Sequence, residues 1–520
     1  MASSGEGEVI LCTSDCILDK VTKGILSNSI MKKFLLASLL VIIALTAAAP
    51  LLLFSVQDNY HTDVTVKLPE RIDSSEQRLA SALTFKTISQ VPEMIDSSAF
   101  EELLAQLNHD YPYLWANAEV DTFGQYTLLI KLNGSSSKAQ NYLLISHVDV
   151  VPVDQRSLKQ WDQGPFDGTI ENGYIYGRGA LDDKSSALGT LEALESMLKT
   201  GWIPENNLYF SLGQDEEIGG NGGANLVAQH CRDNNLFFEA ILDEGGIISI
   251  GSVPGLEDRP IALIGVAEKG YLSIEVNFNL AGGHSSMPER ENAIAKAAEF
   301  VTYIQSDKIF QAQFSDPVED FITHLGPEMS LGRKTIFALR PLTNSIILSS
   351  YQKSNTGRAL TNNTAIATMI SAGIKDNVVP TNARVVCNTR ILPGTTQRDV
   401  IKAYELAAAK FGGIVSQYQA SSSEATATSS STSQAFIAIG KSITQTFPDA
   451  LVSPYLTIGG TDSKNFTGLS KNTYRFLPIE LKADELSSIH GTNERISIDG
   501  YHNLITFYQR IILAFGDLPS

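Results

Sequence analysis

NLYFSLGQDEEIGG, residues 207–220, places three carboxylates directly after an apolar run that is typical of a buried strand. Asp215, Glu216 and Glu217 follow this run, and two glycines come behind them. Unpaired anions packed against the end of a buried strand are costly. The stretch therefore indicates either a solvated turn or a site that holds something positive.

Strands and helices alternate on both sides of this stretch. Residues 141–151 and 238–246 are typical of further strands, and 185–199 is typical of an amphipathic helix. This alternation predicts an α/β fold with a mostly parallel central sheet. After Gly265 the order becomes strand, helix, two strands, helix and strand, with a loop-rich insertion at about 307–362. That order predicts a ferredoxin-like α+β domain.

The segment at 34–54 contains 21 consecutive uncharged residues. At about 1.5 Å per residue, it is long enough to span the ~30 Å core of a bilayer. Lys32 and Lys33 precede it, and Asp58 and Asp63 follow it, so the positive-inside rule predicts a single-pass type II membrane protein. The remainder would lie in the lumen of a vacuole, lysosome or the secretory pathway, or outside the cell. A cleaved signal peptide is the alternative.

Net charge and cysteine content limit which partners the chain can bind and which side chains can hold a metal. The formal net charge of −18 argues against nucleic acid or an anionic membrane surface as a partner. Beyond the apolar segment the cysteines are Cys231 and Cys387, so a metal there must be held by His and carboxylates. Sequons predict a glycoprotein and begin at Asn133, Asn362 and Asn465.

The chain is predicted to have five parts. They are a cytoplasmic tail at 1–33, a transmembrane helix at 34–54, a catalytic domain in two parts at 75–265 and 425–520, and an inserted lid or dimerisation domain at 266–424.

His147 and Asp149 alternate along the predicted strand 141–151, so their side chains face the same way. They lie at the strand's C-terminal end, where ligands bind in open α/β sheets. His147 could bind a metal, with Asp149 helping to orient its imidazole. A histidine satisfied at a strand end is the simpler alternative, and this motif alone favours it.

Three more motifs carry ionisable groups at element boundaries. YGRGALDDKS (176–185) sets two acids before a helix, where either could instead be an N-cap. ILDEGG (241–246) ends an apolar strand in Asp243 and Glu244, and SSIHGTNE (487–494) contains His490. Taken together, acids and imidazoles at one sheet edge predict a metal cluster, with zinc favoured and manganese or cobalt possible.

The order of these motifs resembles that of the dinuclear zinc aminoacylase and carboxypeptidase family. The motifs are H-x-D, G-R-G-x-x-D-D-K, D-E-E-x-G-G, D-E-G, GGHSS-x-P and S-x-x-H-G-x-N-E. The similarity is strongest to carboxypeptidase S and the N-fatty-acyl-amino-acid hydrolases and synthases. It covers nearly the whole chain after residue 75.

The resemblance implies roles for individual residues. His147, Asp182 and Asp243 would hold one zinc, while Asp182, Glu217 and His490 would hold the other, so that Asp182 bridges the pair. Glu216 would be the general base. Two further groups are implied: His284 as the oxyanion stabiliser, from a partner subunit or after closure, and a set for the substrate carboxylate, namely Asn382, Arg390, Gly459 and Gly460. Relatives often carry Arg where this chain has Lys464.

The predicted activity is zinc-dependent hydrolysis of the amide bond in small peptides or N-acyl amino acids that carry a free carboxylate. N-fatty-acyl-amino-acid hydrolysis or synthesis is the first alternative. A non-catalytic, receptor-like ectodomain is a remote one, because every expected ligand and Glu216 are present. The apolar stretch 336–351 could line an acyl channel or form core, and a homodimer through the inserted domain is a family expectation.

Overall fold

The computed structural model describes residues 32–38, 41, 60, 67–90, 96–306, 308–418 and 422–518. Most of the predicted tail and most of the 34–54 segment lie outside the described residues. Among the residues that are described, no helix is both long enough and apolar enough to cross a membrane.

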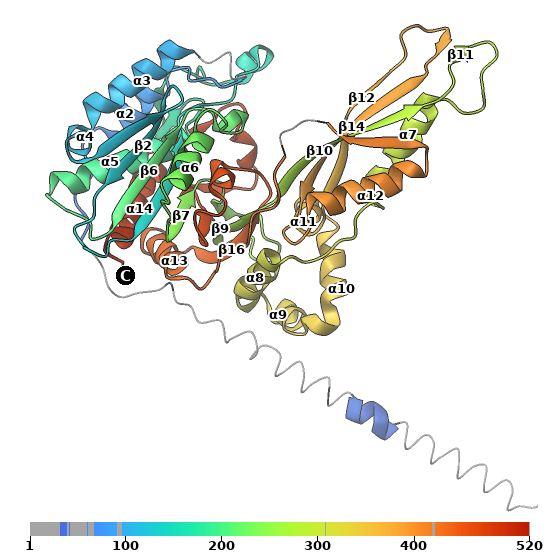
Figure 1. Ribbon diagram of the computed structural model, residues 1–520. Coiled ribbons are helices and arrows are strands. Elements are labelled where there is room, and N and C mark those ends of the chain that lie inside the picture. The colour runs from blue at the N-terminus through green and yellow to red at the C-terminus, as the bar shows by residue number, and fades with distance from the viewer. Residues whose placement is uncertain are drawn as a thin grey trace, which may run out of the picture.

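A large sheet forms the centre of the first body (Figure 1). Its strand order is β1-β2-β6-β3-β7-β17-β9-β8-β18, and β16 pairs with β9. The strands are β1 Glu119–Phe123, β2 Thr127–Leu132, β3 Asn141–His147, β6 Asn207–Gly213, β7 Ala240–Asp243, β8 Ile248–Ile250, β9 Pro260–Glu268, β16 Leu451–Thr457, β17 Thr473–Arg475 and β18 Glu480–Lys482.

The prediction of a mostly parallel sheet is corrected to a mixed one. The strands β6, β3, β7 and β17 run parallel, whereas β1–β2, β2–β6, β8–β9 and β17–β9 are antiparallel pairs. Short connections such as residues 124–126 between β1 and β2 can only join antiparallel neighbours, because a parallel return needs a long crossover. The parallel centre is the part that carries the site.

Helices cover both faces of this sheet. Alternate strand residues divide between two cores: Leu144 and Phe210 pack towards the larger core, and Leu143 and Ile145 towards the smaller one. The larger core is covered by α2 Ser75–Ala82, α3 Ser97–Asp110, α4 Pro112–Asn117, α5 Lys184–Lys199, α13 Gln434–Thr446 and α14 Ile498–Asp517, and the smaller one by α6 Ala224–Asp233. A small sheet of β4 Thr169–Glu171, β5 Tyr174–Tyr176 and β19 Arg495–Ser497 lies beside α14.

The second body is a four-stranded antiparallel sheet with the order β12-β14-β10-β15. In chain order it runs β10 Gly270–Asn279, α7 Ala293–Gln305, β12 Thr364–Ala372, β14 Asn382–Ile391, α12 Gln397–Ala409 and β15 Gly413–Gln417. This is the β-α-β-β-α-β order expected from the sequence. A hairpin-like pair, β11 Gly283–His284 with β13 Val378–Val379, projects at the end remote from the large sheet (Figure 1).

The insertion predicted to be loop-rich is helical. It contains α8 Asp316–Leu325, α9 Leu331–Ala338, α10 Arg340–Tyr351 and α11 Asn355–Thr361. Proline in the first turn of α8 and α10 and the cap formed by Ser354 on α11 favour helix starts that the apolar pattern alone does not reveal. Part of 336–351 is core, since Ile347 is 4% exposed.

Candidate active site

Three parallel neighbours, β6, β3 and β7, end at the same edge of the large sheet. His147 is the last residue of β3, and the short helix η3 Glu216–Ile218 follows β6. Asp243 is the last residue of β7, and Glu244 follows it. The parallel register thus brings together motifs that lie about 100 residues apart in the chain.

Asp182 lies between two imidazoles. Its Oδ1 is 3.0 Å from His147 Nε2, and its Oδ2 is 2.9 Å from His490 Nε2. A carboxylate that presents one oxygen to each of two imidazoles has the geometry of a bridging metal ligand. The structure therefore brings Asp182, His147 and His490 together.

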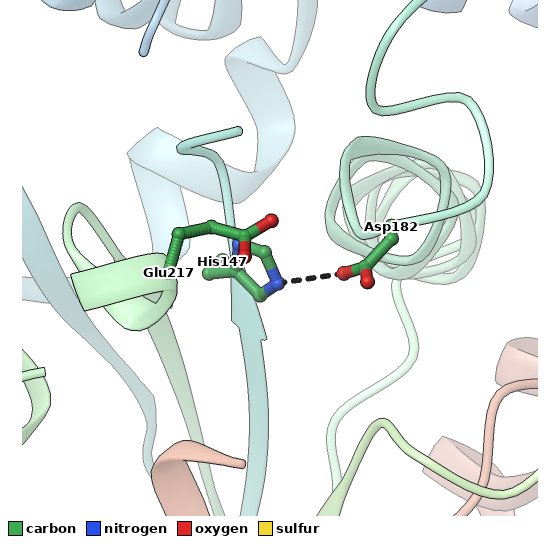
Figure 2. Close-up of side chains that lie close together, drawn as sticks. All are labelled: His147, Asp182 and Glu217. Carbon is green, nitrogen blue, oxygen red and sulfur yellow. Dashed lines mark hydrogen bonds and ion pairs between the residues drawn. The ribbon is translucent and has the colours of Figure 1, made fainter. Parts of the chain in front are cut away.

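Glu217 completes this group. Its Oε1 is 3.2 Å from His490 Nε2, and ligand atoms of Glu217, His147 and Asp182 all lie within 4.8 Å of one another. Figure 2 shows the three side chains converging from separate elements, with the contact from His147 to Asp182 drawn. The carboxylate of Glu217 is nearly buried, whereas His490 is 47% exposed and marks the open side of the site.

The structure brings Glu244, rather than Asp243, to His147. Glu244 Oε1 is 3.7 Å from His147 Nε2, and it groups with His147 and Asp183 as a possible metal-ligating set. Asp243 instead accepts hydrogen bonds from the backbone N–H of Ser463 at 2.7 Å and of Glu244 at 2.9 Å. Neighbouring residues at the end of a strand point to opposite sides, which the sequence motif could not resolve.

Asp149 holds two parts of the site at once. Its two carboxylate oxygens accept the backbone N–H groups of Glu216 at 3.1 Å and Glu217 at 3.2 Å. His147 Nδ1 lies 3.1 Å from the Asp149 carbonyl and 3.3 Å from Asp149 Oδ1. A proton on Nδ1 leaves the lone pair on Nε2 free for a metal. The orienting role predicted for Asp149 agrees with these contacts.

A buried pair that the sequence reasoning missed joins two ligand loops. Arg178 forms an ion pair with Glu494, and both side chains are almost fully buried. Glu494 Oε1 accepts the backbone N–H of Asp182 at 3.2 Å, while Arg178 Nη2 donates to the His490 carbonyl at 3.0 Å. Both residues stand inside the quoted motifs, as the R of G-R-G and the final E of H-G-x-N-E, so their position was the available signal.

The electrostatics of the site describe a crowded set of buried acids. Burial and the neighbouring Asp182 raise the pKa of Glu244 to about 8. Burial also raises the pKa of Asp183 and of Glu216 well above the usual range. Hydrogen bonds to Asp182 and Glu217 raise the pKa of His490 to about 10. Each shift is one that a bound cation would relieve.

These donors fit a divalent metal. The group offers imidazole nitrogen and carboxylate oxygen without thiolate, which is the donor set of catalytic zinc sites and also suits manganese or cobalt. Both described cysteines are buried and free, and neither belongs to the group. The chemistry of the ligands therefore fits the prediction of a divalent metal at this site.

Two cationic side chains, Arg390 and Lys464, lie near the backbone of Gly460. A Cβ atom built on Gly460 would lie 3.9 Å from Arg390 Nη1 and 4.0 Å from Lys464 Nζ, and one on Gly459 would meet nothing within 4 Å. The backbone at 459–460 is thus open and next to two positive charges. Arg390 also lies over the ring of Tyr271, 5.0 Å from its centroid.

His284 and Asn382 lie away from the metal ligands, in the remote part of the second body. His284 is in β11 and contacts Ser286 through Nδ1 at 2.7 Å, and Asn382 Nδ2 donates to Asn279 at 2.8 Å. Asn382 and Arg390 stand near opposite ends of β14, roughly 27 Å apart along the strand at ~3.4 Å per residue. The structure does not bring His284 and Asn382 to the other site residues.

The fold and this group define a class of protein. A parallel sheet edge that gathers imidazoles and carboxylates around one shared carboxylate, with a further buried glutamate beside them, is the arrangement of a metal-dependent hydrolase. The chain belongs to peptidase family M20/M25/M40, whose model matches residues 143–514. The predicted family and the prediction of a metallopeptidase-class enzyme are confirmed.

Curated relatives agree in length as well as in sequence. The chain is 34% identical over 479 residues to a probable carboxypeptidase S-like 2 of Dictyostelium discoideum, covering 86% of this chain and 88% of the relative. It is 31% identical over 438 residues to an N-fatty-acyl-amino acid synthase/hydrolase of Xenopus tropicalis, covering 84% and 85%.

Solved structures support the fold. An M20 family metallo-carboxypeptidase of Sulfolobus solfataricus superposes with a TM-score of 0.61 at 19% identity, covering 86% of this chain and all of the other. Human carnosine dipeptidase 1 gives a TM-score of 0.57 at 16% identity, covering 85% and 96%.

Proposed function

We propose that this enzyme hydrolyses the amide bond of small peptides or N-acyl amino acids that carry a free carboxylate, using two zinc ions per subunit. The observation that carries the proposal is Asp182, whose two oxygens face the imidazoles of His147 and His490 within 3.0 Å. The chain's membership of peptidase family M20/M25/M40 supports the same reaction, and the two cations near Gly460, Arg390 and Lys464, support the same substrate class.

Each zinc would be held by residues from a different side of Asp182. On one side we assign His147 and an acid at the end of β7, for which the geometry favours Glu244 over Asp243. On the other side we assign Glu217 and His490. Manganese or cobalt could occupy the same donors.

When bound, the two ions would lower the pKa of a water and polarise the scissile carbonyl. Glu216 is the proposed general base, which takes the proton from that water and passes it to the leaving amine. Its backbone is fixed by Asp149, and burial raises the pKa of its carboxyl, which suits a group that must both accept and donate a proton near neutral pH.

The substrate carboxylate is proposed to bind at Gly459 and Gly460, facing Arg390. Two positive charges converge there, and the glycine backbone leaves room for the ligand. Lys464 offers a point charge, whereas the guanidinium of Arg390 can contact both oxygens of a carboxylate, so we assign the bidentate contact to Arg390.

We propose that His284 and Asn382 act from a second copy of the chain or after closure of the second body. Both lie in its remote part, which supports delivery from outside this subunit. Mixing the single variants His284→Ala and Glu216→Gln tests delivery in trans. Activity regained in the mixture would indicate that a second copy of the chain supplies these residues, as in a homodimer. If no activity is regained and the protein has a monomeric mass, closure of the second body would be the explanation.

One experiment tests the function directly. The full chain loaded with zinc is offered an N-blocked dipeptide and an oleoyl amino acid, and kcat/KM is compared. We expect turnover of at least one, and loss of roughly 10²–10⁴-fold in kcat in Glu216→Gln with zinc retained. Turnover of the oleoyl substrate alone would select N-fatty-acyl-amino-acid hydrolysis, which can also run as synthesis. A wild-type rate in Glu216→Gln would reject the assignment of the base.

We also propose that the apolar segment 34–54 anchors the chain in a membrane, with the enzyme on the lumenal or extracellular side. The support is the uncharged run and its flanking charges in the sequence. Resistance of the chain to extraction with alkaline carbonate, and protection of the enzyme part from protease in sealed vesicles, would be expected. A freely soluble mature protein lacking the segment would show a cleaved signal instead.

A further inference from the structure

The helices α9 and α10 carry a cluster of exposed apolar side chains. Leu331 is 70% exposed and Ile336 39% in α9, while Leu342 is 77% and Ile346 63% exposed in α10. Leu342 and Ile346 are four residues apart and therefore share one face of their helix. Four large apolar side chains exposed on two consecutive helices are typical of an interaction surface.

The charge of this region opposes that of the whole chain. Between Met329 and Asn363, which covers α9, α10 and α11, there are five cations and no acid, whereas the chain has a formal net charge of −18. The cations are Arg333, Lys334, Arg340, Lys353 and Arg358. Acids of neighbouring elements lie beside this segment, since Arg340 pairs with Glu319 of α8 at 2.9 Å and Glu328 precedes α9, so the cations are in excess but not alone.

Apolar side chains together with an excess of cations are typical of helices that lie in a membrane interface. Leucine and isoleucine enter the boundary between headgroups and acyl chains, and the cations contact lipid phosphate. The acidic balance of the whole chain argued against a membrane partner, but it averages over this local reversal of sign.

The N-terminal stretch attaches to the molecule on the same side as α9 and α10. Tyr60 packs on α13, with its ring 6.0 Å from that of Phe436, and its carbonyl accepts the Thr444 hydroxyl at 2.8 Å. Five residues separate Tyr60 from the end of the apolar segment at Phe54, which limits the separation to about 20 Å. A bilayer holding that segment would therefore lie close to α13.

The helix α8 links α13 to the exposed cluster. Ser431, just before α13, donates to Asp320 of α8 at 3.0 Å, and Arg340 at the start of α10 pairs with Glu319 of α8. Figure 1 shows α8, α9 and α10 along the same lower side of the molecule as α13. The helix that Tyr60 packs on and the helices α9 and α10 thus lie on a common side.

We propose that α9 and α10 form a lipid-docking surface, made of Leu331, Ile336, Leu342 and Ile346 with the neighbouring cations, that rests on a phospholipid bilayer. The proposal goes beyond the catalytic assignment and does not depend on it. It rests in part on the proposed anchor, which brings this side of the enzyme close to a bilayer. Docking would hold the second body next to amphiphilic substrates dissolved in the membrane.

The test places a photo-crosslinking benzophenone amino acid at Leu342 in the full chain, incorporated in vesicles of phosphatidylcholine with phosphatidylserine. The matched control carries the same group at Leu406, which is 64% exposed and lies outside the proposed surface, in the helix α12 that packs on β10 and β15. We expect about tenfold more lipid adduct at position 342 than at 406, because only the former would reach the acyl boundary.

A second variant separates lipid from other occupants. Arg333→Gln combined with Lys334→Gln should lower the lipid adduct at position 342 several-fold, because each cation near a phospholipid surface contributes to binding. Crosslinking of 342 to another copy of the chain would overturn the proposal in favour of a protein interface. Equal, low lipid adduct at 342 and 406 would overturn it as well. Neither readout requires enzyme activity, so a failed catalytic assignment would remain distinguishable.

Discussion

Arg178 and Glu494 form a buried ion pair that fastens the loop of Asp182 to the loop of His490. Glu494 Oε1 accepts the backbone N–H groups of Gly179, Leu181 and Asp182 at 3.0, 2.8 and 3.2 Å. Arg178 donates to the carbonyl of His490 at 3.0 Å. The two loops are more than 300 residues apart, so this pair sets the spacing of two ligands that the chain itself does not connect.

Replacing Glu494 by Gln should weaken zinc binding at least about tenfold and destabilise the fold by about 3–5 kcal/mol, because Arg178 would remain buried without a counter-charge. Titration with a zinc-competing chelator and thermal unfolding measure the two effects. Asp154→Asn is the control, since Asp154 pairs with Arg156 in solvent and its loss should change neither quantity. Unchanged zinc affinity in Glu494→Gln would contradict the spacing role.

Stability of the metal-free protein should fall as pH rises from 5 to 8. The folded state keeps a proton on Glu244, whose pKa is raised from 4.5 to about 8, whereas the unfolded state has already released most of it at pH 5. His490, with a pKa raised from 6.5 to about 10, acts in the same direction above pH 6.5. Calorimetry at both pH values measures the change.

Zinc should counter this loss, because a cation at the site favours the ionised carboxylates and the neutral imidazoles. The rise in Tm on adding zinc should therefore be larger at pH 8 than at pH 5. An equal rise at both values would mean that Glu244 and His490 do not meet the metal.

Glu244→Gln and Asp243→Asn should differ in what they remove. Glu244 lies 3.7 Å from His147, so its amide variant should lower bound zinc from two ions per chain towards one. Asp243 accepts backbone N–H groups of Ser463 and Glu244, so its variant should chiefly lower stability. Metal analysis of both purified variants shows which of the two residues binds zinc. Loss of zinc only in Asp243→Asn would support Asp243 as the ligand, as the motif implied.

Arg390→Ala should raise KM for substrates with a free carboxylate about tenfold or more, because a charge-assisted contact is lost. Substrates whose carboxylate is blocked as an amide should be affected little. Arg384→Ala is the control, since Arg384 lies on the same strand but pairs with Glu275. Equal loss for both substrate types would indicate that Arg390 supports the fold through its contact with Tyr271 instead.

Much of this protein's structure could be predicted from local sequence patterns. The strands ending at His147 and Gly213, and the helix that begins at Lys184, follow from apolar periodicity and from the acids and glycines that interrupt it. The order of motifs identified the family, and the second sheet follows the predicted β-α-β-β-α-β order. These features depend on neighbours within a few residues or on the order of segments, which a sequence states directly.

Other features depend on contacts between distant segments, and only the tertiary structure decided them. The antiparallel pairings that make the sheet mixed, the side of β7 on which Glu244 rather than Asp243 lies, and the pair of Arg178 with Glu494 each require knowing which strand or loop packs beside which. The exposed face of α10 is of the same kind, because the sequence gives the apolar residues but not which of them find a core. Whether a side chain is buried, exposed or paired depends on the residues that surround it in space. Those neighbours come from distant segments, so only the folded structure shows them.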